Sequence, residues 1–321
     1  MSVARAATPV LADLREAAAG LEGVAVHTRL VDAPFLSRVA GVPVALKCEQ
    51  DQPMGAFKAR GAYTALRRMD PAARARGVIT YSSGNHGQAI AWAARKFGVR
   101  AVIVMPEAAP RIKVEGVKGF GGEVVFSPPA STARRRLAEE IAAREGLVIV
   151  PPFDDADIMA GQGTCGLEIL EERPEVAAIL VPVGGGGLLA GICLAVEALR
   201  PEVEVIGVEP AGAAKLTAAW AAGEPVTLER TASVADGLLP LAIGSLTFPI
   251  IHRVVRRVVT VADDDIRRAV RALNAEVGLR VEPSGAATSA AILAGLQLPG
   301  PAVAVVSGGN VDDAVFAELA G

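Results

Sequence analysis

Short apolar runs alternate along this chain with longer stretches in which apolar and charged residues recur at helical spacing. A short run of Val, Ile, Leu and Ala predicts a strand that is buried on both faces. The longer Ala-rich stretches predict helices that cover such strands. Strands are predicted at residues 42–47, 77–80, 99–105, 123–126, 147–151, 178–183, 203–208 and 302–306. Helices are predicted at residues 55–69, 88–97, 113–120, 133–145, 161–172, 188–199 and 263–277.

The order of these elements, strand then helix through most of the chain, predicts βαβ units and therefore an α/β fold with parallel strands. No Gly/Ser-rich or charge-rich linker separates two halves, and no repeat of fixed period is visible. If the fold has two lobes, the chain is expected to pass between them without a long tether.

Residues 176–196 carry no charged side chain and are together long enough to be mistaken for a membrane span. Pro182 and the four glycines at 184–187 lie in the middle of this stretch, where a lipid-exposed helix tolerates them poorly. The stretch therefore predicts a strand, a glycine loop and a helix, and no membrane association.

Composition narrows the class of protein further. Lys and Arg total 32 against 35 Asp and Glu, a net charge of −3 that offers no basic face for nucleic acid. A hydrophobic content of 51% excludes global disorder. Cys48, Cys165 and Cys193 lie far apart without a C-x-x-C pair, which argues against disulfides and zinc. With no apolar signal peptide at the N-terminus, we expect a cytoplasmic globular protein.

The first segment with candidate chemistry is Gly55-Ala56-Phe57-Lys58-Ala59-Arg60-Gly61, which follows a predicted strand. Only six of the 32 basic residues are lysines, so a lysine between Phe57 and Ala59 at a helix start is unusual in this chain. Desolvation there would favour the neutral amine, which can form a Schiff base with an aldehyde. The alternative is a surface lysine whose stem lies along the protein.

Two more segments combine small polar residues with glycines directly after a predicted strand. Ser82-Ser83-Gly84-Asn85-His86-Gly87-Gln88 would expose backbone N–H groups and hydroxyls at a helix N-terminus, where a carboxylate can bind. Ser307-Gly308-Gly309-Asn310 places a hydroxyl where it could contact a ring nitrogen. Taken alone, the first is equally well an ordinary N-cap loop and the second a plain turn.

The glycine run at 184–187, between a predicted strand and helix, predicts a phosphate cradle built from backbone donors. The same residues also satisfy a dinucleotide fingerprint, Gly185-x-Gly187-x-x-Ala190, with Glu209 near the position of a ribose-binding acid. An NAD-dependent dehydrogenase is therefore an alternative. The chain contains no G-x-x-x-x-G-K-[ST], H-E-x-x-H or G-x-S-x-G motif, and only three histidines.

Together, in this order, these segments resemble the fold-type II pyridoxal-phosphate enzymes, and most closely the serine/threonine dehydratases and serine racemases. The matching motifs cover nearly the whole chain: MGAFKARGA (54–62), SSGNHGQA (82–89), PFDD (152–155), AGQGT (160–164), PVGGGGLLAG (182–191), GVEP (207–210), ADG (235–237), FPI (248–250), EPSGA (282–286) and SGGN (307–310).

The resemblance implies a tryptophan synthase β-like fold of two lobes, each an open twisted sheet flanked by helices. Residues 1–76 and 151–321 would form the large domain that binds pyridoxal 5'-phosphate, and residues 77–150 a small domain with the substrate-carboxylate loop. The implied coenzyme contacts are Phe57, Lys58, Asn85, Gly184, Gly185, Gly186, Gly187, Leu188, Gly237, Glu282 and Ser307. The implied substrate contacts are Ser82, Ser83, Asn85 and His86.

The resemblance further implies that Lys58 removes the Cα proton and that the chain eliminates water from L-threonine or L-serine, giving a 2-oxo acid and ammonia. A serine racemase, with Ser83 as the acid/base on the face opposite Lys58, or a 3-hydroxyaspartate dehydratase would use the same site. A non-catalytic amino-acid-binding protein is a more distant alternative. Homodimers are usual among the enzymes that the chain resembles.

The chain departs from the family pattern at three places. Ala56 stands where many members have Ser, and the segment at 27–30 lacks the usual Pro. Members with a divalent-cation site use acidic residues at the positions of Glu209 and Lys215. A lysine at the second position predicts that no metal binds here, and its ammonium is a candidate to take the place of the cation. Because 14 residues follow Ser307, we expect no regulatory domain after it.

Overall fold

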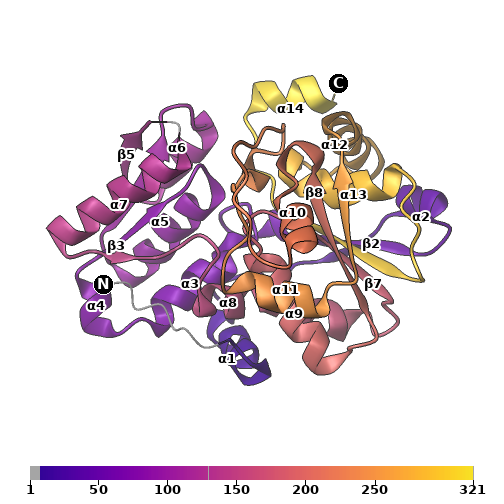
Figure 1. Cartoon of the computed structure of the whole chain (residues 1–321), viewed down its shortest axis with the longest axis horizontal. Coiled ribbons are helices and arrows are strands. Elements are labelled where there is room, and N and C mark those ends of the chain that lie inside the picture. The colour runs from indigo at the N-terminus through magenta and orange to yellow at the C-terminus, as the bar shows by residue number, and fades with distance from the viewer. Residues whose placement is uncertain (1–7, 129, 321) are drawn as a thin grey trace.

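This computed structural model describes residues 8–128 and 130–320. The described residues contain two separate β-sheets, which lie side by side in Figure 1. Nearly all strand pairs are parallel and helices flank both sheets, so the predicted α/β fold is confirmed. Residues 1–7 and 321, which the predicted large domain includes, lie outside the described residues.

The larger sheet has six strands in the order β1-β2-β10-β7-β8-β9. They are β1 (Leu30–Asp32), β2 (Val44–Cys48), β10 (Ala302–Val306), β7 (Ala178–Pro182), β8 (Glu204–Pro210) and β9 (Arg257–Val261). Only the edge strand β1 is antiparallel to its neighbour. β2, β7 and β10 are buried along their whole length, as their uninterrupted apolar sequences require.

The smaller sheet has four parallel strands in the order β5-β4-β3-β6. They are β5 (Glu123–Ser127), β4 (Ala101–Pro106), β3 (Val78–Tyr81) and β6 (Val148–Ile149). All four strands fall within the segment 77–150 that the sequence assigns to a small domain. Helix α3 (Lys58–Arg68) packs both on α5 (Asn85–Phe97) beside this sheet and on α8 (Ala156–Glu172), so the domain boundary stays a prediction.

Helices cover both faces of the six-stranded sheet. On one face α8 and α9 (Gly187–Leu199) pack together, with α1 (Leu11–Leu21) and α11 (Thr247–Val254) outside them. On the other face lie α2 (Pro34–Ala40), α12 (Asp263–Val277) and α13 (Pro283–Leu293), with α14 (Asp313–Ala320) against α12. α10 (Lys215–Ala222) follows β8.

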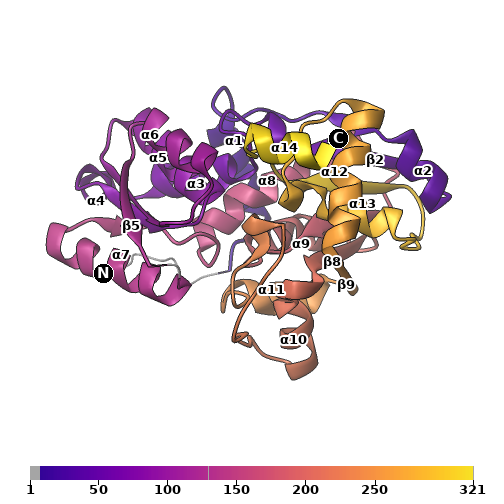
Figure 2. The ribbon, with the colours of Figure 1, turned by 90° about the horizontal axis from the view of Figure 1, so that it is seen from above.

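The four-stranded sheet is likewise sandwiched. α5 and α6 (Arg111–Gly119) cover one face, α7 (Ser131–Glu145) covers the other, and α4 (Pro71–Ala75) leads into β3. Figure 2 shows α5, α6 and α7 at one end of the molecule and α12 and α13 at the other.

All predicted helices and strands are found, but several ends differ for identifiable reasons. α8 begins earlier than predicted because the Asp155 carboxylate accepts hydrogen bonds from the N–H groups of Asp157 and Ile158, capping the helix there. α3 begins at Lys58, later than predicted, because Gly55 has a left-handed φ of 77°.

Several elements were not predicted from the sequence: β1, β9, α1, α2, α4, α10, α11, α13 and α14. α13 shows the reason most clearly. It consists mainly of Ala, Ser, Gly and Thr and is buried from Pro283 to Ile292, so no polar face marks it as a helix.

The uncharged stretch at 176–196 folds as predicted, into β7, the glycine loop and α9. Among the described residues no helix is long and apolar enough to cross a membrane.

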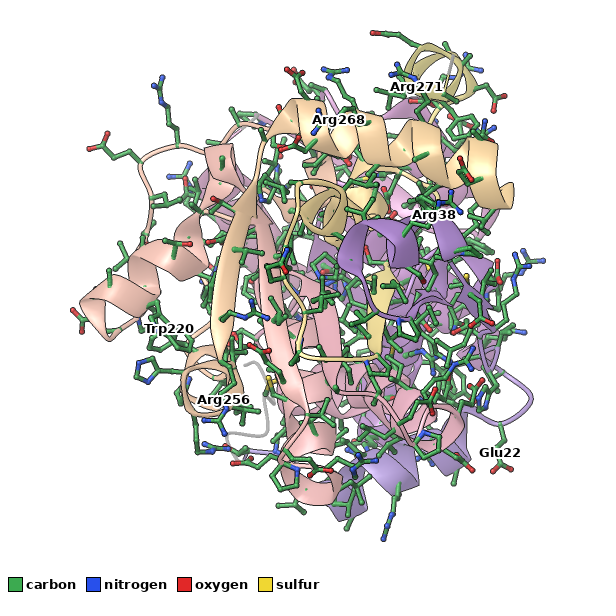
Figure 3. The ribbon with its side chains drawn as sticks, turned by 90° about the vertical axis from the view of Figure 1, so that its right-hand side faces the viewer. Glu22, Arg38, Trp220, Arg256, Arg268 and Arg271 are labelled. Carbon is green, nitrogen blue, oxygen red and sulfur yellow. The ribbon has the colours of Figure 1, made fainter. Side chains whose placement is uncertain are left out.

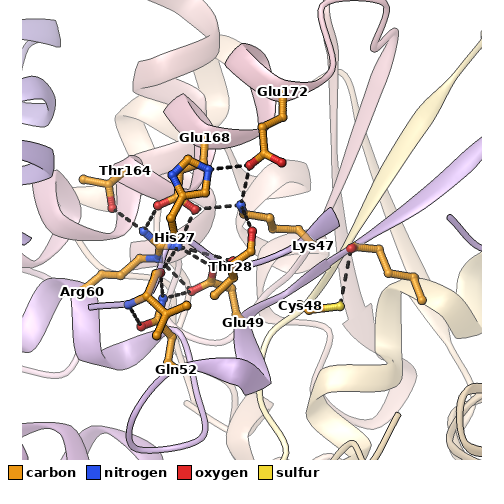
Figure 4. A network of polar contacts seen from close by, with 12 residues as sticks. His27, Thr28, Lys47, Cys48, Glu49, Gln52, Arg60, Thr164, Glu168 and Glu172 are labelled. Carbon is orange, nitrogen blue, oxygen red and sulfur yellow. Dashed lines mark hydrogen bonds and ion pairs between the residues drawn. The ribbon is translucent and has the colours of Figure 1, made fainter. Parts of the chain in front are cut away.

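A buried polar network fastens the start of α3 to its neighbours (Figure 4). The Arg60 guanidinium lies 2.7 Å from the carboxylate of Glu49, after β2, and 2.5 Å from that of Glu168 on α8. Lys47 on β2 lies 2.7 Å from Glu168 and donates a 2.6 Å hydrogen bond to the Thr28 carbonyl. Because each buried charge has a partner, the network fixes the position of α3 and hence of Lys58 at its first turn.

Three of the six lysines are fully buried, as Arg60 is, whereas many arginines lie at the surface. Exposed arginines such as Arg38 on α2 and Arg268 and Arg271 on α12 lie on the outer helices (Figure 3). Lys47, Lys113 and Lys215 are instead among the largest fully buried side chains. Because burying a charge is costly without partners, the surroundings of each buried lysine carry information about function.

Candidate active site

The four segments singled out from the sequence all follow strand ends and meet between the two sheets. Ser82 directly follows β3, Ser307 directly follows β10, and the glycine loop follows β7. Lys58 lies on the connection that leaves β2. Ligands of open parallel sheets bind outside the carboxyl ends of their strands, so this is where a site is expected.

Lys58 is the first residue of α3, and its amine donates a 2.5 Å hydrogen bond to the Pro152 carbonyl. The residue is partly exposed, but its amine points inward, 5.1 Å from the centroid of the Phe57 ring. Burial lowers the pKa of Lys58 to about 7. A large fraction of the amine is therefore neutral and nucleophilic at neutral pH.

The segment before Lys58 runs beside the segment after β10. The Phe57 N–H donates to the Ser307 carbonyl at 3.1 Å, and the Gly309 N–H donates to the Gly55 carbonyl at 2.9 Å. Ala56 and Gly308 form an isolated antiparallel bridge. These backbone bonds bring the predicted Schiff-base lysine and the predicted ring-nitrogen serine onto adjoining segments.

The serine loop, residues 82–86, leads into α5 and is held by hydrogen bonds of Gly84 and His86. The Gly84 N–H donates to the Ser82 hydroxyl at 3.0 Å, and Ser83 is partly exposed. The buried His86 ring lies 3.2 Å, Nε2 to O, from the Val150 carbonyl. Burial, with a smaller effect from the nearby Lys58 charge, lowers the pKa of His86 to about 3. The imidazole is therefore neutral at neutral pH and serves as a hydrogen-bonding group, not as a proton donor.

Asn85, the first residue of α5, joins the serine loop to the far sheet. Its side-chain amide donates a hydrogen bond to the carboxylate of Glu282, and its oxygen accepts one of 2.9 Å from Asn310. Asn310 also donates to the Met54 carbonyl at 3.0 Å. Burial raises the pKa of Glu282, while Lys113 and Asn85 act in the opposite direction. Asn85 and Glu282, both predicted coenzyme contacts, thus face each other.

The glycine loop has the shape of an anion cradle. Gly186 has a left-handed φ of 98° and α9 begins at Gly187, so successive backbone N–H groups point out of the loop. A Cβ atom on Gly185 would overlap the ring of Phe153. Leu188 is buried in the core, so only its backbone is available to a ligand.

Gly237 and Ser307 share Ser284 as a partner. The Gly237 N–H donates to the Ser284 hydroxyl at 2.9 Å, and the Ser307 hydroxyl donates to the Ser284 carbonyl at 3.4 Å. A Cβ atom on Gly184 would lie 3.2 Å from the Gly237 carbonyl oxygen. The glycine loop, Gly237 and Ser307 are therefore held close together around Ser284.

Lys113, which was not predicted from the sequence, lies between the serine loop and Glu282. Its ammonium lies 2.9 Å from the Glu282 carboxylate and 2.6 Å from that of Asp236. Its stem passes so close to Gly84 that a Cβ atom there would overlap it. The scarcity of lysine, which drew attention to Lys58, is the signal that could have found Lys113 as well.

Glu209, the residue on which the dinucleotide alternative depends, faces the interior. It is fully buried, and its carboxylate accepts hydrogen bonds from the Leu216 N–H at 2.9 Å and the Thr217 N–H at 2.7 Å. A carboxylate that caps α10 in this way cannot also hold a ribose. Among the described residues no group of three or more His, Cys, Asp and Glu side chains is placed to hold a metal ion.

The arrangement suits a phosphorylated aldehyde: a partly neutral amine, a backbone cradle for an anion and a serine loop for a second anion. Comparison with known proteins agrees with this chemistry. The sequence profile of the family described as pyridoxal-phosphate dependent enzyme matches residues 22–308.

Individual relatives cover nearly all of the chain. L-threonine ammonia-lyase from Thermotoga maritima is 38% identical over 303 residues, 94% of this chain and 76% of the relative. L-threo-3-hydroxyaspartate ammonia-lyase from a Pseudomonas species is 38% identical over 309 residues, covering 96% and 97%. The structure of maize serine racemase superimposes with a TM-score of 0.93 at 35% identity, covering 97% of each chain.

Proposed function

The chain belongs to the pyridoxal-phosphate dependent enzyme family, and from this premise we propose that it eliminates water from L-threonine or L-serine, releasing a 2-oxo acid and ammonia. The observation that carries the proposal is the buried amine of Lys58, with its pKa lowered to about 7, on a segment whose Phe57 N–H is hydrogen-bonded to the Ser307 carbonyl. Family relatives that act as ammonia-lyases support it.

The residues present fit pyridoxal phosphate. The backbone N–H groups of Gly184, Gly185, Gly186, Gly187 and Leu188 would hold the phosphate, in a loop too tight for side chains. Asn85, already oriented by Glu282 and Asn310, would hold the ring hydroxyl. Phe57, Gly237 and Glu282 would line the ring. When bound, the coenzyme supplies an electron sink for negative charge that develops at the substrate Cα.

Lys58 acts first as the covalent anchor and then as the base. With the coenzyme and substrate bound, the free amine of Lys58 would take the Cα proton at Nζ. A pKa of about 7 suits both the acceptance and the return of a proton near neutral pH. The Pro152 carbonyl, 2.5 Å away, orients the amine before substrate arrives.

The serine loop holds the substrate carboxylate. Ser82 and Ser83 offer hydroxyls and the start of α5 offers N–H groups, so a carboxylate there is bound without a cationic side chain. His86 is neutral and buried, and its hydrogen bond to the Val150 carbonyl keeps the loop in shape. The β-hydroxyl would leave as water by taking up the proton that Lys58 removed from Cα, and the unsaturated amine that remains would react with water to give the 2-oxo acid and ammonia.

Ser307 would present a neutral hydroxyl, not a carboxylate, to the ring nitrogen of the bound coenzyme. A hydroxyl does not hold that nitrogen protonated, so charge at Cα is withdrawn less strongly than a carboxylate partner would allow. The weaker withdrawal of charge from Cα favours rapid expulsion of a β-hydroxyl over transamination.

Serine racemisation is the second candidate function, because Ser83 lies in the carboxylate loop where it could protonate Cα on the face opposite Lys58. Dehydration of 3-hydroxyaspartate is a third, supported by the relative of that name. All three use Lys58 in the same way and differ in the substrate and in the use of Ser83.

The test is direct. The purified protein should be yellow, and borohydride should bleach it and fix the coenzyme on Lys58, as mass spectrometry of the digested protein would show. A screen of L- and D-serine, L-threonine and 3-hydroxyaspartate for release of 2-oxo acid then identifies the substrate. A colourless protein that takes no covalent label after incubation with coenzyme would overturn the proposal.

We further propose that residues 77–150 form the small domain that carries the carboxylate loop, that the protein is cytoplasmic and that it is a homodimer. The four-stranded sheet drawn wholly from that segment supports the first proposal. Three buried free cysteines, Cys48, Cys165 and Cys193, are consistent with a reducing compartment. Light scattering of the purified protein tests the dimer.

A further inference from the structure

Lys215, the first residue of α10, has no exposed surface, yet its ammonium is surrounded by oxygen atoms. It donates hydrogen bonds to three backbone carbonyls: Val183 at 2.7 Å, Leu238 at 2.9 Å and Ala213 at 3.0 Å. The Glu209 carboxylate lies 3.7 Å away. No part of the reaction described above uses this lysine.

The number of partners indicates the charged form. A protonated lysine has three N–H donors, and the three carbonyls accept one each, whereas a neutral amine would leave one carbonyl unpaired. Burial lowers the pKa of Lys215 to about 8, and Glu209 limits the decrease. Most of the side chain therefore remains charged at neutral pH.

The three carbonyls come from segments that are far apart in the sequence, and two of them border the coenzyme site. Val183 immediately precedes Gly184, the first residue of the phosphate cradle. Leu238 immediately follows Gly237, the predicted ring contact. One ammonium therefore connects the backbone that would hold the phosphate to the backbone that would line the ring.

We propose that Lys215 is a positioning residue that acts as a tethered cation, holding the glycine loop and the Gly237 segment in the geometry that receives the coenzyme. Three carbonyl oxygens and a carboxylate are the kind of ligand set that binds a hard inorganic cation. Here the ammonium occupies this oxygen cage, so the protein needs no free cation at that position.

Two consequences follow. The natural protein should bind coenzyme equally well with or without added cations or chelators. A variant that lacks the ammonium should lose affinity and become dependent on a cation small enough to enter the cage. This role of Lys215 rests on the proposed binding of pyridoxal phosphate, but not on which amino acid is the substrate.

The experiment compares Lys215→Ala and Lys215→Met with the natural chain. Coenzyme dissociation constants are measured by spectroscopic titration, and the bound phosphate is followed by ³¹P NMR. Lys47→Met is the matched control, because Lys47 is equally buried but bonds to Thr28, Glu168 and Glu172. Melting temperatures of the coenzyme-free proteins are recorded with potassium, ammonium, propylammonium and tetramethylammonium chloride.

We expect Lys215→Ala to bind coenzyme about tenfold or more weakly, with a changed ³¹P signal, since charge-assisted hydrogen bonds are lost. Potassium, ammonium or propylammonium should restore affinity and raise the melting temperature of this variant, and tetramethylammonium should not. In Lys215→Met the side chain still fills the cage, so no salt should rescue it. Lys47→Met should lower the melting temperature without changing the ³¹P signal.

Unchanged coenzyme affinity and an unchanged ³¹P signal in Lys215→Ala would overturn the proposal. So would a loss of affinity in Lys215→Ala that no cation restores and that Lys47→Met reproduces, because the lysine would then serve only general stability. A colourless protein in every variant and in the natural chain would instead contradict the proposed function.

Discussion

The ammonium of Lys113 lies 2.9 Å from the carboxylate of Glu282, although Lys113 lies on α6 beside the four-stranded sheet and Glu282 precedes α13 on the six-stranded sheet. Asp236 completes the group at 2.6 Å from the same ammonium. Burial alone would lower the pKa of Lys113, but the two carboxylates outweigh it and raise that pKa above its usual value. The serine loop and the coenzyme-lining residues are thus joined by one buried cation.

Replacing Lys113 should therefore destabilise the protein strongly. In Lys113→Met the stem is retained, but the buried Glu282 loses its counter-charge, and we expect the free energy of unfolding to fall by about 3 kcal/mol. Urea denaturation of the coenzyme-loaded protein measures it.

The matched control is Lys118→Met on the same helix. Lys118 is 53% exposed and pairs with the exposed Glu115, so about 0.5 kcal/mol or less is expected. Equal losses of unfolding free energy in the two variants would show that the contact between Lys113 and Glu282 stabilises the protein no more than an exposed ion pair does.

Lys58 should make the stability of the coenzyme-free protein depend on pH. Its pKa is about 7 in the folded state against an ordinary 10.5, so between these values the unfolded chain binds more protons. The free energy of unfolding should therefore rise with pH through this window, and Lys58→Met should flatten the rise. Lys215 adds a rise above its pKa of about 8 in both proteins and cancels in the comparison.

Unfolding by urea at pH 7, 8 and 9 measures the effect of Lys58. Lys96→Met, at an exposed position on α5, is the control and should keep the slope of the natural chain. A Lys58→Met protein with that same slope would mean that the amine is not desolvated as described.

His86 should lower the stability of the folded protein at acid pH. Its pKa of about 3 lies below the ordinary 6.5, so stability is present above pH 6.5 and is lost as the pH falls toward 3, where the unfolded chain takes up the proton first. Between pH 7 and pH 5 this single group should cost about 2 kcal/mol. His86→Gln should show a smaller acid loss in urea titrations, and an identical loss would contradict the assignment.

Ser83→Ala separates elimination from racemisation. If Ser83 delivers a proton to Cα, racemase activity should fall by about a hundredfold or more. Elimination from the L-substrate depends on Lys58 and should partly survive. Chiral chromatography of serine and a 2-oxo acid assay measure the two rates. Parallel loss of both rates would assign Ser83 to carboxylate binding alone.

Gly185→Ala should damage the phosphate cradle. The new methyl group would overlap the Phe153 ring, and we expect about 1–3 kcal/mol of destabilisation together with weaker coenzyme binding. Gly119→Ala, at the end of α6 where nothing lies within 4 Å of the added atom, is the control. Coenzyme titration and thermal melting should show a change only in Gly185→Ala. Equal behaviour of the two variants would show that the loop can accommodate a Cβ atom.

The sequence by itself determined the α/β class, the order of most strands and helices and the segments that carry chemistry. Apolar runs such as Ala302–Val306 and glycines after strands are local features, and local physics makes them strands and turns wherever they occur. The motif around Lys58 was recognisable because it lies on one short stretch.

Only the tertiary structure decided which groups meet. Lys113, Asp236 and Glu282 come from distant parts of the chain, and no periodicity announces that one ammonium will join them. The same holds for Lys215, whose three carbonyl partners belong to the backbone and have no sequence signature. Burial, which lowers the pKa of Lys58 and His86, likewise depends on packing between the sheets that no single segment specifies.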